Sequence, residues 1–195
     1  MDTARQSDPP ATDRFRSRDE LLESLPYILS APADEGQVRA IVIRPAEGQR
    51  RMLDRVDVSA RGGLEGDHWA KGCWLSTEDG APHPDVQVCI MSARCIEAIA
   101  GPEANWAAAG DNLFIDMDLS PENLPPGTRV AIGTVELILT AEPHNGCQSF
   151  IDRYGRDACV FVNTGPGKAN RLRGIYGRVT RDGTIRRGDV MRKIG

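Results

Sequence analysis

Cys147 has the sequence surroundings of a reactive thiol. It follows an apolar, β-branched stretch at residues 135–140 and directly precedes a segment with helical character that begins at Gln148. The N-terminus of a helix carries partial positive charge, which favours the thiolate over the thiol. A thiolate attacks sulfur or binds a soft metal ion, whereas most free cysteines are small buried apolar residues. The local sequence leaves both interpretations open.

The composition excludes several classes of protein. The 195 residues are 40% hydrophobic and 27% charged, which is typical of one globular domain with a sizeable core. A net charge of −4 does not indicate nucleic-acid binding, and no apolar run reaches the roughly 20 residues that span a bilayer. The five cysteines lack C-x-x-C spacing, and the first residues lack the apolar segment of a secretory signal. We therefore expect a cytoplasmic protein with no disulfide framework, no nucleic-acid partner and no membrane partner.

Residues 1–36 are predicted to form a partly disordered extension with one helix. Residues 1–16 are polar and contain prolines, a composition typical of disorder. The helix is predicted over residues 17–29, because Ser17 can cap it and Glu20 stands at the spacing of a capping box. Pro26 should kink or end this helix. Its apolar face should pack on the main domain and consists of Leu21, Leu22, Leu25 and Ile28.

Residues 37–195 are predicted to form a single, mainly β domain. Glycine-containing turns lie at Gly133 and at Asp182-Gly183, and the second has the composition of a hairpin turn. Helices are predicted over residues 92–100 and 102–109, whereas residues 157–163 fit either a helix or a strand. Many short strands that are adjacent in sequence favour an antiparallel barrel or sandwich with helical insertions. The predicted strands are residues 38–44, 86–91, 130–132, 134–140, 174–180, 184–186 and 190–193.

Positive charge is concentrated near the C-terminus. Residues 168–195 contain nine basic and two acidic side chains, a net charge of +7. Guanidinium groups bind phosphate through paired hydrogen bonds, so arginines at a barrel mouth would hold a phosphorylated small-molecule ligand. Arg173 and Arg178 are the candidates for this contact. The alternative is a hairpin whose arginines face solvent.

Several motifs occur in a characteristic order along the chain. They are G-L-E-G-D-H-W at residues 63–69, G-D-N-L at 110–113, G-T-R-V-A-I-G-T-V-E-L at 127–137, P-H-N-G-C at 143–147, and a glycine- and arginine-rich stretch at 171–189. In this order and spacing they resemble the MOSC family, named for the C-terminal domain of molybdenum cofactor sulfurases. The resemblance covers roughly residues 37–195. It implies a mainly β fold, a distorted antiparallel β-barrel with a few short helices.

The resemblance also implies which residues form the site. The signature cysteine, which carries persulfide or binds molybdenum in family members, falls on Cys147, and the asparagine near the cofactor falls on Asn112. The segment after the strand at residues 86–91 supplies polar cofactor contacts in related enzymes, which points to Ser92 and Arg94. The amide of Asn112 suits a pterin edge, and Ser92 stands at a helix start where backbone N–H groups bind anions. From the residues alone, the simpler roles are a turn cap for Asn112 and a helix cap for Ser92.

The residue before the cysteine departs from the family pattern. Gly146 stands where many relatives carry arginine or another polar residue. His144 is the candidate to compensate by pairing with the thiolate, and an ordinary loop histidine is the alternative. His68, Cys73, His144 and Cys147 together offer the donors of a zinc site, although their spacings are not standard.

Other cysteines and acidic residues have simpler interpretations. Cys89, Cys95 and Cys159 lie in apolar stretches and are predicted core residues. Asp67 and Asp111 follow glycines in tight loops, where a carboxylate commonly accepts hydrogen bonds from nearby backbone N–H groups. We therefore predict that both aspartates stabilise turns.

Two functional hypotheses follow, and Cys147 is the reactive residue in both. In the first, the protein binds the molybdenum cofactor (molybdopterin), Cys147 ligates the metal, and N-hydroxylated compounds are reduced. The chain has no iron–sulfur cysteine cluster, so this hypothesis requires a separate electron donor. In the second, the protein is a sulfur carrier rather than a turnover enzyme. Cys147 then accepts persulfide from a cysteine desulfurase for the assembly of cofactor or metal–sulfur clusters. Pyridoxal phosphate binding is a further property linked to the resemblance, and a binding module without redox chemistry is the third alternative.

Overall fold

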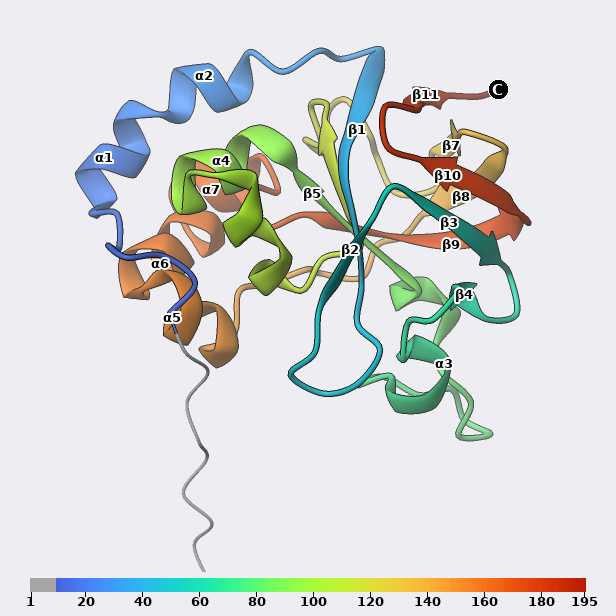
Figure 1. Ribbon diagram of the computed structural model, residues 1–195. Helices are drawn as coiled ribbons and strands as arrows, with labels where there is room; N and C mark the ends of the chain where they lie inside the picture. The colour runs from blue at the N-terminus through green and yellow to red at the C-terminus, as the bar shows by residue number, and fades with distance from the viewer. Residues whose placement is uncertain (1–9) are drawn as a thin grey trace, which may run out of the picture.

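Within residues 10–195, which the computed structural model describes, seven strands close into a β-barrel (Figure 1). Around the ring the strands follow the order β1, β6, β5, β9, β8, β7 and β11, and the ring closes because β11 pairs with β1. This confirms the predicted barrel. The strands are β1 (Glu35–Ile43), β5 (Val88–Ser92), β6 (Leu113–Asp116), β7 (Arg129–Ile132), β8 (Val135–Leu139), β9 (Ile175–Arg181) and β11 (Val190–Lys193).

One pair of strands departs from the antiparallel pattern. β5 and β6 run parallel, with Met91 opposite Phe114. Helix α4 (Ala93–Ala100) and the 3-10 helix η2 (Glu103–Ala109) connect them across the outside of the barrel. Parallel neighbours need a crossover connection of this length, so the predicted helices at residues 92–109 make the barrel mixed rather than purely antiparallel.

A second, smaller sheet lies beside the barrel. It consists of β10 (Gly183–Arg186), β3 (Arg55–Ser59) and β4 (Gly63–Leu64), while β2 (Arg51–Leu53) extends the barrel next to β1. The hairpin predicted at Asp182-Gly183 is wrong, because β10 pairs with β3 and not with β9. Both edges of β9 are already occupied by β5 and β8, which leaves no edge on which a returning strand can pair.

Apolar residues form two packed layers on either side of the barrel wall. Along β8 the buried residues alternate with half-buried ones, so Val135, Leu137 and Leu139 point into the barrel. The second layer lies between the barrel and the helices, where Phe150 and Tyr154 are buried. A strand that separates two packed layers is buried on both faces, which explains the continuous apolar run of β5.

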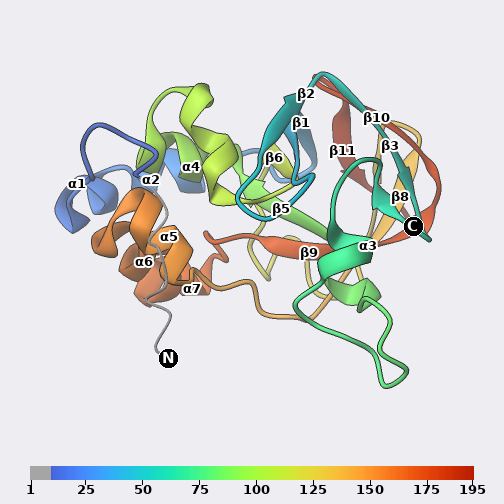
Figure 2. The ribbon, with the colours of Figure 1, turned by 60° about the horizontal axis from the view of Figure 1, so that its bottom comes forward.

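Most helices gather on one side of the barrel (Figures 1 and 2). These are α4 and η2 together with α1 (Arg18–Glu23), α2 (Leu25–Leu29), α5 (Gln148–Tyr154), α6 (Arg156–Asn163) and α7 (Gly165–Ala169). Helix α6 settles the ambiguous residues 157–163 as helical. Helix α3 (Trp69–Gly72) and the 3-10 helix η1 (Pro84–Val86) lie away from this group, near the smaller sheet (Figure 2). In the described range no helix combines the length and apolarity that crossing a membrane requires.

The predicted N-terminal helix exists as two short helices. Ser17 and Glu20 form the predicted capping box of α1, and Pro26 lies in the first turn of α2, where a missing N–H costs nothing. Leu21 and Ile28 are buried against the main domain as predicted, but Leu22 is exposed. Leu22 directly follows Leu21 within α1, so its side chain points about 100° around the helix axis from the buried one.

The segment before α1 contacts the main domain from residue 11 onward. The Ala11 N–H donates to the Arg153 carbonyl at 2.9 Å, and the ring of Phe15 packs against Gly155. Residues 1–9 of the predicted disordered segment lie outside the described range. In the described part, Ala11 and Phe15 are the residues of this segment that make these contacts.

Candidate functional site

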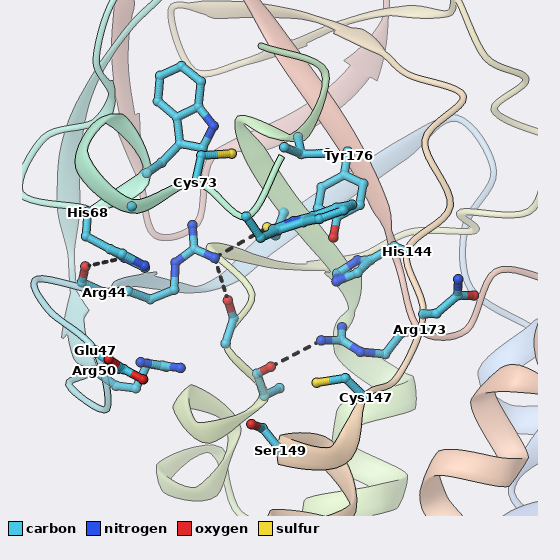
Figure 3. A pocket seen from close by; sticks show the side chains of 18 of the residues that line it. Arg44, Glu47, Arg50, His68, Cys73, His144, Cys147, Ser149, Arg173 and Tyr176 are labelled. Carbon is cyan, nitrogen blue, oxygen red and sulfur yellow. Dashed lines mark hydrogen bonds between the residues drawn. The ribbon is translucent and has the colours of Figure 1, made fainter. Parts of the chain in front are cut away.

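A cavity of about 850 Å³ opens at the end of the barrel where β1 and β8 finish and β6 begins (Figure 3). Its walls come from six segments that are distant in sequence, namely residues 44–50, 68–74 around α3, 86–89, 109–110, 143–153 and 173–176. Three predicted site residues, Cys147, His144 and Arg173, line this cavity. The fold therefore brings these three together.

Arg44, the first residue after β1, is held in the cavity wall by a buried carboxylate. Its Nη2 and Nε atoms lie 3.0 Å from the two oxygens of Asp67, which also accepts the Trp69 N–H at 3.0 Å. Burial raises the pKa of Asp67, but the contacts with Arg44 outweigh burial and the net shift is downward. The turn role predicted for Asp67 is confirmed by the Trp69 contact, although its main partner is Arg44.

Asn112 completes this network from inside the protein. Its Oδ1 accepts the Cys89 N–H at 3.0 Å and an Arg44 N–H at 3.3 Å, and its Nδ2 donates to Asp67 Oδ2 at 3.1 Å and to the Val42 carbonyl at 3.2 Å. The side chain is fully buried and does not line the cavity. In the structure Asn112 fixes the Asp67–Arg44 pair.

Arg173 forms a second buried ion pair on the opposite wall. Its Nη1 lies 2.9 and 2.7 Å from the two oxygens of Asp111, and its Nη2 donates to the Ala109 carbonyl at 3.2 Å. The guanidinium also lies over the Phe150 ring, 4.9 Å from its centre. Burial raises the pKa of Asp111, and Arg173 offsets part of that rise. The carboxylate of Asp111 binds the Arg173 guanidinium, so its role is to pair with this buried cation rather than the predicted stabilisation of a turn.

His144 is a neutral ring packed between charged and aromatic neighbours. Its Nδ1 lies 3.6 Å from Asp111 Oδ1, and its ring stacks on Tyr176 with 4.3 Å between centroids. Burial, and then the positive charges of Arg173 and Arg44, lower the pKa of His144 well below 6.5. A neutral imidazole can share a hydrogen bond with a ligand but supplies no positive charge to a nearby thiolate.

Cys147 is an exposed thiol directly before α5, as predicted. Its carbonyl accepts the N–H groups of Phe150 and Ile151 at 3.0 and 3.1 Å, which fixes its backbone to the first turn of α5. Figure 3 shows its sulfur turned toward the cavity. An exposed sulfur at a cavity wall is available both to a bound small molecule and to a partner protein.

The other cysteines have the surroundings that their sequence context predicted. Cys89, Cys95 and Cys159 are buried, and burial raises the pKa of Cys89 to about 11 and that of Cys95 to about 12. Cys73 is half-buried in the cavity wall. These values leave almost no thiolate on Cys89 or Cys95 near neutral pH.

The zinc alternative is not supported. His68, Cys73, His144 and Cys147 all line the cavity. However, no three His, Cys, Asp or Glu side chains within residues 10–195 are grouped closely enough to hold a metal ion. The donors are spread around a wide cavity instead of converging on one point.

Besides Asn112, three further predicted site residues do not line the cavity. Ser92 is buried and caps α4 by accepting the Cys95 N–H at 3.3 Å. Arg94 binds Asp116 at 2.6 Å and Ser30 Oγ at 2.8 Å, so it ties α4 to the N-terminal helices. Arg178 is exposed and pairs with Asp85 at 3.3 Å.

Sequence reasoning missed three arginines of the cavity wall. Arg44, Arg50 and Arg153 join Arg173 there, and Glu47 is the acidic side chain among the lining residues. Arg44 could have been predicted from the sequence, because it is a charged residue directly after a buried strand, and such strand ends often form sites. Arg50 and Arg153 could not have been predicted, since only the tertiary fold places their segments beside the cavity.

The cavity wall also contains buried polar atoms without a hydrogen-bond partner among the described residues. These are the Nε1 of Trp69, the Nδ1 of His144 and the Nε of Arg173. A buried donor that lacks a partner costs free energy, so such atoms mark places where a ligand would complete the bonding. The combination of these atoms with four arginines fits an anionic ligand rich in hydrogen-bonding groups.

Comparison with known proteins identifies the family. The family model of the MOSC domain matches residues 78–192, more than half of the chain. The chain belongs to the MOSC domain family. The matched region contains Cys147, Arg173 and the barrel strands from β5 to β11.

Solved structures show the same fold. The YuaD protein from Bacillus subtilis is 18% identical, with a TM-score of 0.55 over 80% of this chain and 94% of that one. YiiM from Escherichia coli is 18% identical with a TM-score of 0.52, over 82% of this chain and 70% of that one. YiiM from Geobacillus stearothermophilus is 16% identical with a TM-score of 0.52, over 82% and 75%. A search of curated protein sequences finds no significant match.

Proposed function

We propose that the cavity binds the molybdenum cofactor, with Cys147 as the protein ligand of the metal. The observation that carries this proposal is an exposed thiol in the wall of a cavity of about 850 Å³ that four arginines also line. A thiolate is a soft ligand suited to molybdenum. The pterin contributes metal ligands of its own, so a single protein ligand is compatible with the scattered donors of this site.

Charge supports an anionic ligand. Arg44, Arg50, Arg153 and Arg173 line the cavity, against Glu47 in the same wall. Two of these arginines are already paired with Asp67 and Asp111, and such pairing fixes their guanidinium groups before a ligand arrives. Pre-fixed arginines bind phosphate with little further loss of side-chain freedom.

The unpartnered atoms give individual residues a role toward the same ligand. The indole N–H of Trp69 and the Nε–H of Arg173 are donors, and the Nδ1 of neutral His144 either donates or accepts. A pterin ring system carries both carbonyl and amino groups at its edge, so it can satisfy donors and acceptors together. These residues would bind and orient the cofactor, while Cys147 holds the metal.

The proposed reaction is the reduction of N-hydroxylated compounds. When bound, the cofactor supplies the electron transfer that such a reduction needs. The five cysteines are all free thiols and none belongs to a metal-binding group in the described residues, so we propose a separate protein as electron donor. Free thiols also suit a reducing cytoplasm, which is the proposed location.

Metal analysis tests the proposal directly. Protein purified from a host that makes the cofactor should contain stoichiometric molybdenum and pterin, measured by elemental mass spectrometry and by fluorescence of the released pterin. Cys147→Ser should lose the molybdenum, because an alcohol is a hard and weakly acidic ligand. Cys95→Ala is the matched control, since it removes a buried thiol outside the cavity and should retain the metal. Wild-type protein without molybdenum from such a host would exclude the proposal.

A sulfur carrier is the second candidate, and one observation favours it. Cys147 is exposed, so its sulfur is accessible to a partner such as a cysteine desulfurase. Metal-free protein that carries a labile sulfane sulfur on Cys147 would support this function.

Pyridoxal phosphate binding is not proposed for this cavity. Proteins hold it through a lysine amine, and no lysine is among the described residues that line the cavity.

A further inference from the structure

A second cysteine lies directly beneath the loop that carries Cys147. A Cβ atom built on Gly146 would lie 3.0 Å from Cys159 Sγ and 3.1 Å from Asn163 Nδ2. Real side chains essentially never come closer, so the main chain at residue 146 rests on the Cys159 sulfur. The departure from the family pattern at Gly146 therefore has a local reason, because a larger residue would push the loop off Cys159.

Asn163 holds the loop in this position. Its Oδ1 accepts the Gly146 N–H at 2.9 Å, and its Nδ2 donates to the Gly146 carbonyl at 3.1 Å and to Cys159 Sγ at 3.3 Å. One amide thus ties the backbone next to Cys147 and the sulfur of Cys159 to the same point. Both cysteines keep a fixed relation although they are twelve positions apart in sequence.

The two thiols differ in access to solvent. Cys147 is exposed, whereas Cys159 is buried on α6. Burial, followed by the nearby Cys147 sulfur, raises the pKa of Cys159. An oxidant from solvent therefore reacts with Cys147 before it can reach Cys159.

We propose that Cys147 and Cys159 form a reversible intramolecular disulfide when Cys147 is oxidised by a hydroperoxide. In the reduced protein the Cys147 sulfur faces the cavity (Figure 3), so reaching Cys159 requires the two hydrogen bonds between Asn163 and Gly146 to break and residues 141–147, which contain no helix or strand, to rearrange. Cys159 Sγ already packs against the backbone at Gly146, the residue next to Cys147, and the disulfide forms once the two Cβ atoms come about 3.5–4.5 Å apart. The inference shares with the proposed function only the reactivity of Cys147.

The chemistry balances with hydrogen peroxide as the oxidant. The Cys147 thiolate attacks one peroxide oxygen, the O–O bond breaks, hydroxide leaves, and a sulfenic acid forms. The Cys159 sulfur then attacks the Cys147 sulfur, the S–O bond breaks, and water leaves with the proton from Cys159. In sum two thiols lose two hydrogens and one peroxide becomes two waters. A dithiol reductant reverses the reaction by thiol–disulfide exchange.

The disulfide would remove the Cys147 sulfur from the cavity. A sulfur bonded to Cys159 can neither ligate a metal nor accept persulfide. It is also protected from irreversible oxidation to the sulfinic acid. Cys159 is thus assigned as a resolving thiol that switches the site off under oxidation and preserves it for later reduction.

Peptide mass mapping tests the assignment. Cofactor-free, fully reduced protein is treated with a small excess of hydrogen peroxide, alkylated, and digested with trypsin without reductant. Trypsin cleaves between the two cysteines, so Cys147 leaves on residues 130–153 and Cys159 on residues 157–168. The expected product is a disulfide-linked pair of these two peptides, formed in protein that remains monomeric. The linked pair should disappear after treatment with dithiothreitol.

Two variants separate the proposal from its alternatives. Cys159→Ala should yield no linked pair and should leave Cys147 as a sulfenic acid that a sulfenic-acid trapping reagent captures. Cys73→Ser, a matched control that lacks the half-buried thiol of the cavity wall, should form the linked pair as wild type does. Circular dichroism spectra confirm that each variant is folded. The assignment is overturned if wild-type Cys147 is oxidised while Cys159 remains free to alkylate after denaturation, or if Cys147 links to a different cysteine. Molybdenum retention by protein that forms no disulfide would leave the proposed function intact.

Discussion

Two arginines only five positions apart in the sequence have opposite surroundings. The Arg173 side chain is 7% exposed and pairs at 2.7 Å with the fully buried carboxylate of Asp111 in the cavity wall. The Arg178 side chain is 46% exposed and pairs at 3.3 Å with Asp85, which is itself 33% exposed. Both belong to the same basic C-terminal segment. The difference shows that a buried carboxylate partner, and not the density of basic residues, marks the arginine that belongs to the site.

The largest expected effect on stability comes from removing the buried carboxylate that pairs with Arg173, compared with removing the partly exposed partner of Arg178. Asp111→Ala should lower the free energy of unfolding by about 3–5 kcal/mol, because it leaves the Arg173 charge buried and unpaired. Asp85→Ala should lower it by less than about 1 kcal/mol, since the partly exposed pair is screened by water. Urea denaturation of both variants measures the difference. Similar losses for the two variants would remove the distinction between the two arginines.

The thiols provide a comparable contrast between an exposed cysteine and buried ones. Cys147 is exposed, whereas burial raises the pKa of Cys89 to about 11 and that of Cys95 to about 12. In folded, metal-free protein near neutral pH, Cys147 should react with an alkylating agent at least about 100-fold faster than Cys89 or Cys95. Competitive labelling followed by peptide mass mapping checks this ratio. Equal rates would mean that Cys147 is not accessible and would refute both proposed functions.

The pH dependence of stability tests the positive surroundings of the cavity. The folded-state pKa of His144 lies well below its ordinary value of 6.5, because of burial and of the charges on Arg173 and Arg44. Below pH 6.5 the unfolded chain therefore binds a proton that the folded protein does not, so stability decreases as the pH falls. The loss should reach about 1.4 kcal/mol per pH unit until the folded-state pKa is approached.

His144→Gln provides the control for this pH effect. The variant has no titrating ring at position 144, so its stability should fall less steeply than that of wild type between pH 6.5 and 5.5. Urea denaturation of both proteins across this range gives the two slopes. Identical slopes would show that burial and the nearby arginines do not lower the pKa of His144 in the folded protein.

The smallest expected effect concerns the exposed arginine. Arg178→Glu should change neither the molybdenum content of protein from a cofactor-producing host nor, by more than about 0.5 kcal/mol, the free energy of unfolding. The physical reason is that Arg178 is absent from the cavity wall and is largely solvated. Elemental analysis beside wild type measures retention. A clear loss of metal would mean that Arg178 contributes to the site. The number of basic residues in the C-terminal segment would then predict the site better than a buried carboxylate partner does.

Local sequence patterns predicted much of the fold. The capping box at Ser17 and Glu20, the strand at residues 134–140, and the turn at Gly133 all depend on residues that are neighbours in the chain. The pairing of strands that are distant in the chain was not predicted in this way. The strand at residues 184–186 was predicted and is β10, but its partner β3 lies more than 120 positions away, and the turn at Asp182-Gly183 does not indicate which strand edge is free.

The sequence by itself determined the candidate thiol at the start of a helix, the barrel and the family. Each of these depends on short segments: a cysteine before a helix, strands of β-branched residues, and motifs in a fixed order. Such segments can be recognised before the fold is known. Only the tertiary structure decided which polar residues surround that thiol. The sequence predicted that Asn112 and Ser92 contact the ligand, but in the structure both side chains form hydrogen bonds within the protein. Arg44 and Arg153 face the cavity because the closing of the barrel brings distant strand ends and α5 together. Burial and pairing depend on the whole chain, and no segment contains that information alone.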